Sequence, residues 1–129
     1  MAVSIVEGCL ECVDMPAKLV LVVRSDLGMS KGKIAAQVAH AAVAAALRNQ
    51  HTTRFAAWLR DGQPKVVLKI DGAEELENLC AAAEDAGLPV ERIRDAGRTQ
   101  VAPGTLTCCA IGPAAEEDID PVVTELTLF

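Results

Sequence analysis

Residues 18–24 read Lys18-Leu-Val-Leu-Val-Val-Arg24, a short and nearly continuous run of aliphatic and β-branched side chains. Such a run predicts a β-strand that is covered on both faces, because a half-exposed strand would alternate with polar residues. Ser30 follows after a short connection, and it is suited to cap a helix that we expect to continue to about Asn49. This strand–helix unit indicates an α/β fold.

The alternation of strands and helices continues toward the C-terminus. Residues 65–70, 90–94 and 105–111 each combine aliphatic and β-branched residues and predict three further strands. Between the first two of them, Asp71 and Glu74 have the spacing of N-cap and N3 residues, so a helix is expected to begin there. The chain therefore predicts four strands separated by helices.

Glycine and proline residues predict where the other helices begin and end. A short helix around Trp58 is expected to stop at Gly62, and the helix after residue 71 is expected to stop before Gly87. The dipeptide Gly112-Pro113 is expected to open the last helix, with a kink or a restart at Asp120-Pro121.

These elements predict a three-layer α/β/α sandwich with a four-stranded mixed β-sheet. The sheet is expected to be mixed because residues 94–105 are too few to hold a crossover helix, so the last two strands would pair antiparallel. With 129 residues the chain is expected to form one domain. Residues 1–17 have weak periodicity and three acidic side chains, so we expect a flexible N-terminal tail followed by a folded domain over residues 18–129.

Charge is divided unevenly along the chain. The net charge is −6. Residues 18–70 contain nine Lys or Arg against two acidic residues, a net charge of +7, whereas residues 71–129 contain three Arg against thirteen acidic residues, a net charge of −10. A basic segment that attracts an anion would then coexist with an acidic segment that resists indiscriminate binding. The alternative is that both segments only form solvated surfaces.

The cysteines and the hydropathy predict the compartment. Five cysteines form an odd set without the spacing of a disulfide framework, and no signal peptide is evident, so a reducing cytoplasm is expected. No run of about 18 apolar residues predicts a membrane span. The pair Cys9 and Cys12 supplies only two of the four ligands of a zinc site, so no metal site is expected.

A first candidate site lies in the stretch Met29-Ser-Lys-Gly-Lys-Ile-Ala-Ala-Gln-Val-Ala-His40. Lys31 and Lys33 fall in the first turn of the predicted helix, where cations oppose the helix dipole. A bound phosphate would offset this repulsion, because free amides of the first turn point outward. At about 100° per residue, Gln37 and His40 share the face of Lys33. The alternatives are solvated surface lysines and a buried or half-buried histidine bonded to the backbone.

A second candidate site is the stretch Asp95-Ala-Gly-Arg-Thr-Gln-Val-Ala-Pro-Gly-Thr-Leu-Thr107. Asp95 follows a predicted strand, so its carboxylate would lie on a loop, where it could orient or deprotonate a water molecule. The hydroxyls of Thr99 and Thr107 could hold the attacked carbonyl or the carboxylate. The alternative is an Asx-turn in which Asp95 only shapes the loop.

Both stretches resemble the type 2 peptidyl-tRNA hydrolases of archaea and eukaryotes, as do residues 18–26, 62–69 and 110–113. The resemblance spans about residues 18–129, and several ordered motifs carry it in register. It implies an α/β/α fold, often dimeric, that hydrolyses the ester between peptide and tRNA without a metal or another cofactor. Ser30 stands where the family usually has glycine, a change that a helix N-cap tolerates.

The resemblance also implies which residues act. Catalytic roles fall on Lys33, Asp95, Thr99 and Thr107. Gln37 and His40 would lie nearby, and we expect Lys31 and Arg98 to hold phosphates of the tRNA. The expected partners are peptidyl-tRNA and a second copy of the chain. Two alternatives remain: a non-catalytic module that binds a tRNA end or another phosphate ligand through the same helix start, and an interaction protein that uses the Ala-rich helix or the acidic segment.

Overall fold

The computed structural model describes residues 15–97 and 100–129. The elements follow one another as β1 (Ala17–Arg24), α2 (Lys31–Asn49), α3 (Thr53–Arg60), β2 (Lys65–Ile70), α4 (Ala73–Asp85), β3 (Val90–Arg94), β4 (Leu106–Ala115), α5 (Glu116–Val123) and β5 (Thr127–Leu128). The predicted α/β fold is confirmed. β1 begins one residue before the expected start of the domain, and most of the expected tail lies outside the described residues.

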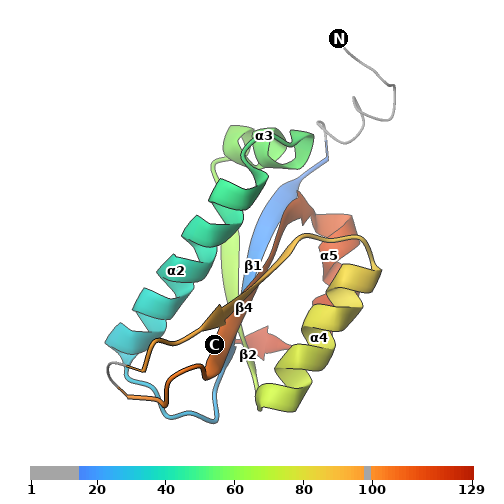
Figure 1. Ribbon diagram of the computed structural model, residues 1–129. Helices are drawn as coiled ribbons and strands as arrows, with labels where there is room; N and C mark the ends of the chain where they lie inside the picture. Colours follow the sequence, from blue (N-terminus) through green and yellow to red (C-terminus); the bar gives the residue numbers. More distant parts are fainter. Residues whose placement is uncertain (1–14, 98–99) are drawn as a thin grey trace.

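The strands form one mixed sheet in the order β3-β4-β1-β2-β5 (Figure 1). β1 pairs parallel with β2, whereas β4 pairs antiparallel with both β1 and β3. The predicted antiparallel pairing of β3 and β4 is therefore confirmed. Because β1, β2 and β3 run in the same direction, their carboxyl ends meet at one edge of the sheet, where α2 and α4 begin.

The sheet has five strands, so the expectation of four is wrong. β5 contains only two residues, and it pairs antiparallel with β2 through Leu68 and Leu128. The amide of Phe129 extends this pairing by donating to the carbonyl of Val67 at 3.0 Å. Two residues are too few to show a strand periodicity, and the pairing depends on a partner about 60 positions away, so the sequence pattern does not reveal β5.

The prediction that Gly112-Pro113 opens the last helix is also wrong. Both residues lie inside β4, joined by a cis peptide bond, and α5 begins only at Glu116. Gly112 has φ of 112°, and a Cβ atom there would lie 2.9 Å from the carbonyl oxygen of Lys18, so the neighbouring strand requires glycine. α5 passes through Pro121 as one helix, without the expected restart.

The N-terminus of α4 differs from the prediction by one residue. Gly72, and not Asp71, is the N-cap, and no side chain caps the helix. The carbonyl of Gly72 accepts the first helical hydrogen bond, from the amide of Leu76 at 3.0 Å. Glu74 and Glu75 still lie in the first turn, where their charges favour the helix dipole.

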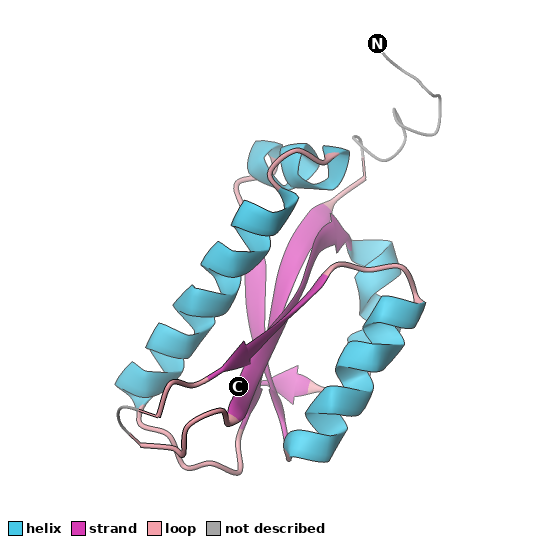
Figure 2. Cartoon of the chain, viewed as in Figure 1, coloured by secondary structure: helices cyan, strands magenta, loops and turns pink. Residues whose placement is uncertain are grey.

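Helices cover both faces of the sheet (Figure 2). Alternate residues of β1 point to opposite faces, which explains why its apolar run is uninterrupted. One face of the sheet packs on α2 and α3, and the other packs on α4 and α5. The first core contains Leu19, Leu21, Val23, Ala41, Ala45, Trp58 and Cys108; the second contains Val20, Val22, Leu76, Cys80, Ile119 and Cys109.

Candidate active site

The two candidate stretches meet at the carboxyl edge of the sheet. The ammonium of Lys33 lies 2.6 Å from Oδ1 of Asp95, and the two side chains are only 12% and 5% exposed. Lys33 is held by the start of α2, because its amide donates to the Ser30 hydroxyl at 3.2 Å, the predicted N-cap bond. Asp95 follows directly after β3, so the pair joins a helix start to a strand end.

The carboxylate of Asp95 accepts three hydrogen bonds from residues that the structure describes. Oδ1 accepts from Lys33 and from Nε2 of Gln37 at 3.3 Å, and Oδ2 accepts from the amide of Gly97 at 2.6 Å. The bond from Lys33 and then the bond from the Gly97 amide hold the pKa of Asp95 below its ordinary value. The bond to Gly97 is an Asx-turn, so the turn and the ion pair are not alternatives: Asp95 forms both at once.

Gln37 and Thr107 form a buried support behind this carboxylate. The Thr107 hydroxyl donates to Oε1 of Gln37, which orients the amide so that Nε2 faces Asp95. Thr107 is fully buried and Gln37 is 7% exposed, so both side chains depend on these bonds. Thr107 therefore reaches Asp95 through Gln37 and not by direct contact.

The remaining predicted residues lie farther out or outside the described residues. His40 is exposed, two helical turns along α2 from Lys33, so the buried form of its alternative is wrong. Lys31 is exposed at the first position of α2. Arg98 and Thr99 lie outside the described residues, as do Cys9 and Cys12.

Gln100 makes a contact with Ser30 that the sequence did not reveal. Its Oε1 accepts the amide of Ser30 at 2.8 Å, and its Nε2 donates to the Ser30 hydroxyl at 2.8 Å. Only the fold brings together these two residues, 70 positions apart. The amides of Ser30 and Lys33 are thus already bonded, so an anion at this helix start would meet the amides of Lys31 and Gly32. A Cβ atom at Gly32 would face open space.

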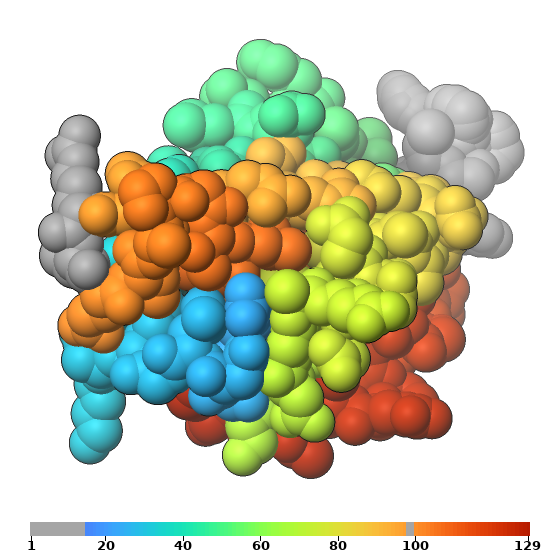
Figure 3. Space-filling view, turned by 60° about the horizontal axis from the view of Figure 1, so that its bottom comes forward, coloured from blue at the N-terminus to red at the C-terminus, as the bar shows by residue number. Residues whose placement is uncertain are grey.

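Figure 3 views the molecule from this edge of the sheet. The start of α2, in cyan, lies against the described part of the following loop, residues 100–105 in orange, as the bonds between Ser30 and Gln100 require. Arg24, at the end of β1, is paired with Asp26 at 2.7 Å. Arg94, directly before Asp95, is exposed, and its guanidinium donates to the carbonyl of Gly104 at 3.5 Å. The edge therefore combines the nearly buried Lys33–Asp95 pair with the exposed side chains of Arg94 and Lys31.

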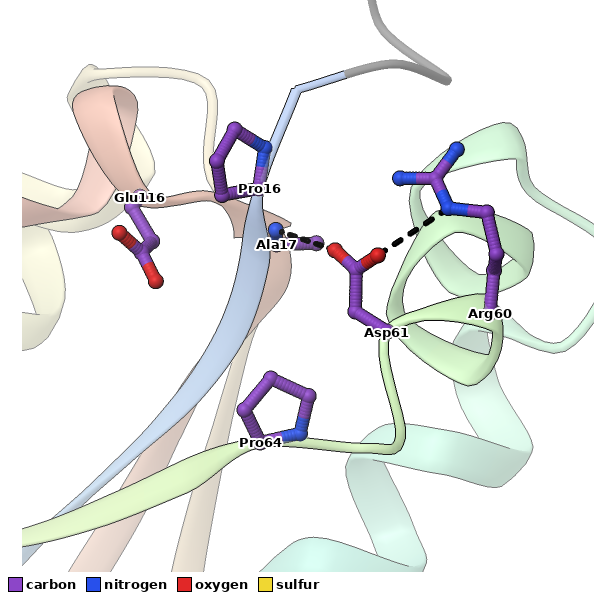
Figure 4. Close-up of a pocket in the computed structure, with 6 residues that line it drawn as sticks. All are labelled: Pro16, Ala17, Arg60, Asp61, Pro64 and Glu116. Atoms are coloured by element: carbon purple, nitrogen blue, oxygen red, sulfur yellow. Dashed lines mark hydrogen bonds and ion pairs between the residues drawn. The ribbon is translucent and has the colours of Figure 1, made fainter.

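A cavity of about 340 Å³ lies at the opposite end of β1, beside the end of α3 (Figure 4). Two of its charged side chains, Arg60 and Asp61, bond to each other. Asp61 accepts from the amide of Ala17 and from Nε of Arg60, both at 3.1 Å. These bonds, that of Arg60 first, hold the pKa of Asp61 below its ordinary value. None of the described residues that the sequence predicted for the site lines this cavity.

Within the part of the chain that the structure describes, three or more His, Cys, Asp or Glu side chains do not gather as metal ligands. Over the same residues, every helix is too short or too polar to cross a bilayer. Cys80, Cys108 and Cys109 are buried free thiols.

The fold and the site together define an α/β protein with a Lys–Asp pair at the carboxyl edge of its sheet, the edge at which proteins of this architecture bind ligands. The family model of peptidyl-tRNA hydrolase PTH2 matches residues 17–129. The chain therefore belongs to the peptidyl-tRNA hydrolase PTH2 family.

Curated relatives agree with this assignment. A peptidyl-tRNA hydrolase of Thermococcus onnurineus is 52% identical over 113 residues, which cover 86% of this chain and 96% of that protein. One of Metallosphaera sedula is 49% identical over 116 residues, covering 87% and 99%. One of Saccharolobus islandicus is 48% identical over 118 residues, covering 87% and 98%. The matched region includes both stretches that form the site.

Proposed function

We propose that this chain hydrolyses the ester bond of peptidyl-tRNA at the Lys33–Asp95 pair, which frees the tRNA for reuse. The observation that carries the proposal is the 2.6 Å contact between these two side chains, in a member of the PTH2 family. In the reaction, water attacks the ester carbonyl, the bond to the 3′-oxygen of the ribose breaks, and the oxygen leaves with a proton. The peptide gains a carboxyl group.

Asp95 orients the attacking water. Two carboxylate oxygens offer about four acceptor positions, and Lys33, Gln37 and Gly97 occupy three of them. Bonds among the described residues thus leave one position on Oδ2 for a water molecule. Because its pKa lies below the ordinary value, Asp95 is a weak base, so its main contribution is to hold and align the water and not to remove its proton.

Lys33 supplies the positive charge that the reaction needs. Negative charge develops on the carbonyl oxygen during attack and on the ribose 3′-oxygen during departure. An ammonium with little exposure to water stabilises such charge more strongly than one in bulk solvent, because the surrounding dielectric is lower. During the reaction, the ammonium of Lys33 would leave the carboxylate of Asp95 and contact the substrate oxygen that gains negative charge.

The outer residues bind the tRNA. Lys31 and Arg98 hold phosphates of the acceptor end, and His40 contacts substrate farther along α2. Thr99 assists at the reacting carbonyl, while Thr107 and Gln37 hold Asp95 in place. The exposure of Lys31 and His40 supports these roles, since a ligand can reach both side chains.

The catalytic domain spans residues 18–129 and works without a metal ion, as a homodimer in the cytoplasm. The family match over residues 17–129 supports the extent of the domain. Exposed apolar side chains support self-association: Val43 and Leu47 of α2 are 58% and 63% exposed, and Leu59 of α3 is 45% exposed. A monomer mass in light scattering at micromolar concentration would contradict the dimer.

Incubation of the purified chain with peptidyl-tRNA in excess EDTA tests the proposed activity. We expect release of free peptide and intact tRNA, at a rate that EDTA does not change. Binding of peptidyl-tRNA without release would favour the non-catalytic module instead. Activity that EDTA abolishes and added zinc restores would contradict the metal-free reaction.

A further inference from the structure

Gln100 and Ser30 form a two-bond contact outside the ion pair. The side-chain amide of Gln100 makes two hydrogen bonds with Ser30. Its Oε1 accepts from the Ser30 amide, and its Nε2 donates to the Ser30 hydroxyl, both at 2.8 Å. Both side chains are exposed. Since each polar atom of the Gln100 amide bonds to Ser30, this side chain is directed at the helix start.

The contact closes a ring of interactions around the site. Ser30 accepts the amide of Lys33, and Lys33 pairs with Asp95, the first residue of the loop that also carries Gln100. The loop is thus bonded to α2 at two places, one nearly buried and one exposed. Lys33 and Gln37 make the inner connection to Asp95, and Gln100 makes the outer connection to Ser30.

The loop that carries Gln100 is itself closely packed. The backbone of Asp95 donates to Thr105 and accepts from Gly104, both at 2.8 Å. A Cβ atom at Gly97 would lie 2.6 Å from the Cα of Pro103, so the two limbs of the loop are in direct contact. These contacts join Asp95 and Gly97 to residues 103–105, on the side of the loop that carries Gln100, so a bond at Gln100 also restrains Asp95.

We propose that Gln100 is a positioning residue, which holds the loop of residues 95–105 against the start of α2 and thereby fixes Asp95 relative to Lys33. The inference rests on the proposed function, because it assumes that the Lys33–Asp95 pair carries out the reaction. Gln100 acts through Ser30 and does not touch the substrate. Its loss therefore lowers the rate of the chemical step and leaves substrate binding nearly unchanged.

The test compares Gln100→Ala with Gln50→Ala. Gln50 is a matched control, because it is an exposed glutamine at the other end of α2 whose side chain bonds to the Leu47 carbonyl. For Gln100→Ala we expect kcat to fall by about tenfold to a hundredfold, the cost of a small misplacement, with KM changed less than about twofold. The Gln50→Ala variant should retain wild-type kinetics.

Two further measurements separate positioning from a general loss of stability. In Gln100→Ala the acid limb of the kcat profile should move to higher pH, because a looser Lys33 contact lowers the pKa of Asp95 less. Gln100→Glu keeps the acceptor for the Ser30 amide but loses the donor to its hydroxyl, so it should restore part of kcat. The melting temperature should change by only a few degrees, since both partners are exposed.

A Gln100→Ala variant with kcat within about twofold of the wild type, or with a raised KM alone, would overturn the proposal. Lys33→Ala and Asp95→Asn are measured beside it. If both retain turnover, the proposed function fails. If both lose turnover while Gln100→Ala does not, only the positioning role fails.

Discussion

The Thr107 hydroxyl donates to the amide oxygen of Gln37, and the amide nitrogen of the same Gln37 donates to Asp95. A fully buried threonine near the start of β4 is thereby linked to the carboxylate that follows β3. The link is buried, so it has no water to replace a lost partner. The position of Asp95 thus depends on the core as much as on Lys33.

Thr107→Val should destabilise the fold and lower the activity. Valine has nearly the shape of threonine, but it leaves the amide oxygen of Gln37 buried without a donor, which costs about 1–3 kcal/mol. Urea unfolding measures the change in the free energy of unfolding. The control is Thr124→Val, an exposed threonine after α5, for which we expect a change within about 0.5 kcal/mol. Equal effects of the two variants would contradict the buried link.

Gly97→Ala should be more damaging than Gly28→Ala. Both glycines have positive φ, 81° and 65°, so each alanine is strained by about 1–2 kcal/mol. Only at Gly97 would the new Cβ also meet backbone, 2.6 Å from the nitrogen and the Cα of Pro103, whereas nothing lies within 4 Å at Gly28. Gly97→Ala should also lower turnover, because its amide bonds to Asp95. Similar unfolding free energies and similar activities would contradict this account.

The contribution of Asp95 to stability should depend on pH in one direction. Lys33 and the Gly97 amide lower the pKa of Asp95 below its unfolded value of about 3.9, so the ionised form stabilises the fold. This stability is present above the unfolded pKa and is lost as the pH falls through the folded pKa. The difference in unfolding free energy between wild type and Asp95→Asn should therefore shrink between about pH 7 and about pH 3. A difference that grows as the pH falls would contradict the lowered pKa.

Strands and helices with strong local signals were predictable from the sequence. β2 and β3 have the predicted bounds, because each contains β-branched residues beside a turn. α2 begins after Ser30, as the capping signal indicates. The end of β4 was not predictable, because Gly112-Pro113 has the composition of a turn and is strand only where Lys18 of the neighbouring strand packs against it.

The sequence predicted which residues form the site but not the hydrogen bonds that hold them in place. A carboxylate after a strand and a lysine at a helix start each indicate chemistry locally, and Lys33 and Asp95 do meet. The contact of Gln100 with Ser30 has no local signal, since a polar residue in a loop is expected in any case. The route from Thr107 to Asp95 through Gln37 likewise depends on which strand lies beneath α2.

Binding of tRNA should depend on salt through Lys31. If its exposed ammonium meets a phosphate, Lys31→Ala should weaken binding and reduce the slope of log K against log salt by about 0.7 to 0.9. Lys18→Ala is the control, because Lys18 already pairs with Asp120 at 2.6 Å. Fluorescence anisotropy of labelled tRNA at several salt concentrations gives both slopes. An unchanged slope for Lys31→Ala would show that Lys31 makes no phosphate contact.

The most direct test of the Lys33–Asp95 pair is single-turnover hydrolysis of peptidyl-tRNA by Lys33→Ala, Asp95→Asn and the double variant. If Lys33 and Asp95 act as one unit, each single variant should lose about 10²- to 10⁴-fold in rate. The double variant should then lose little more than either single variant. Circular dichroism confirms that each variant is folded. Near-normal rates in folded single variants, or losses that multiply in the double variant, would contradict catalysis by this pair.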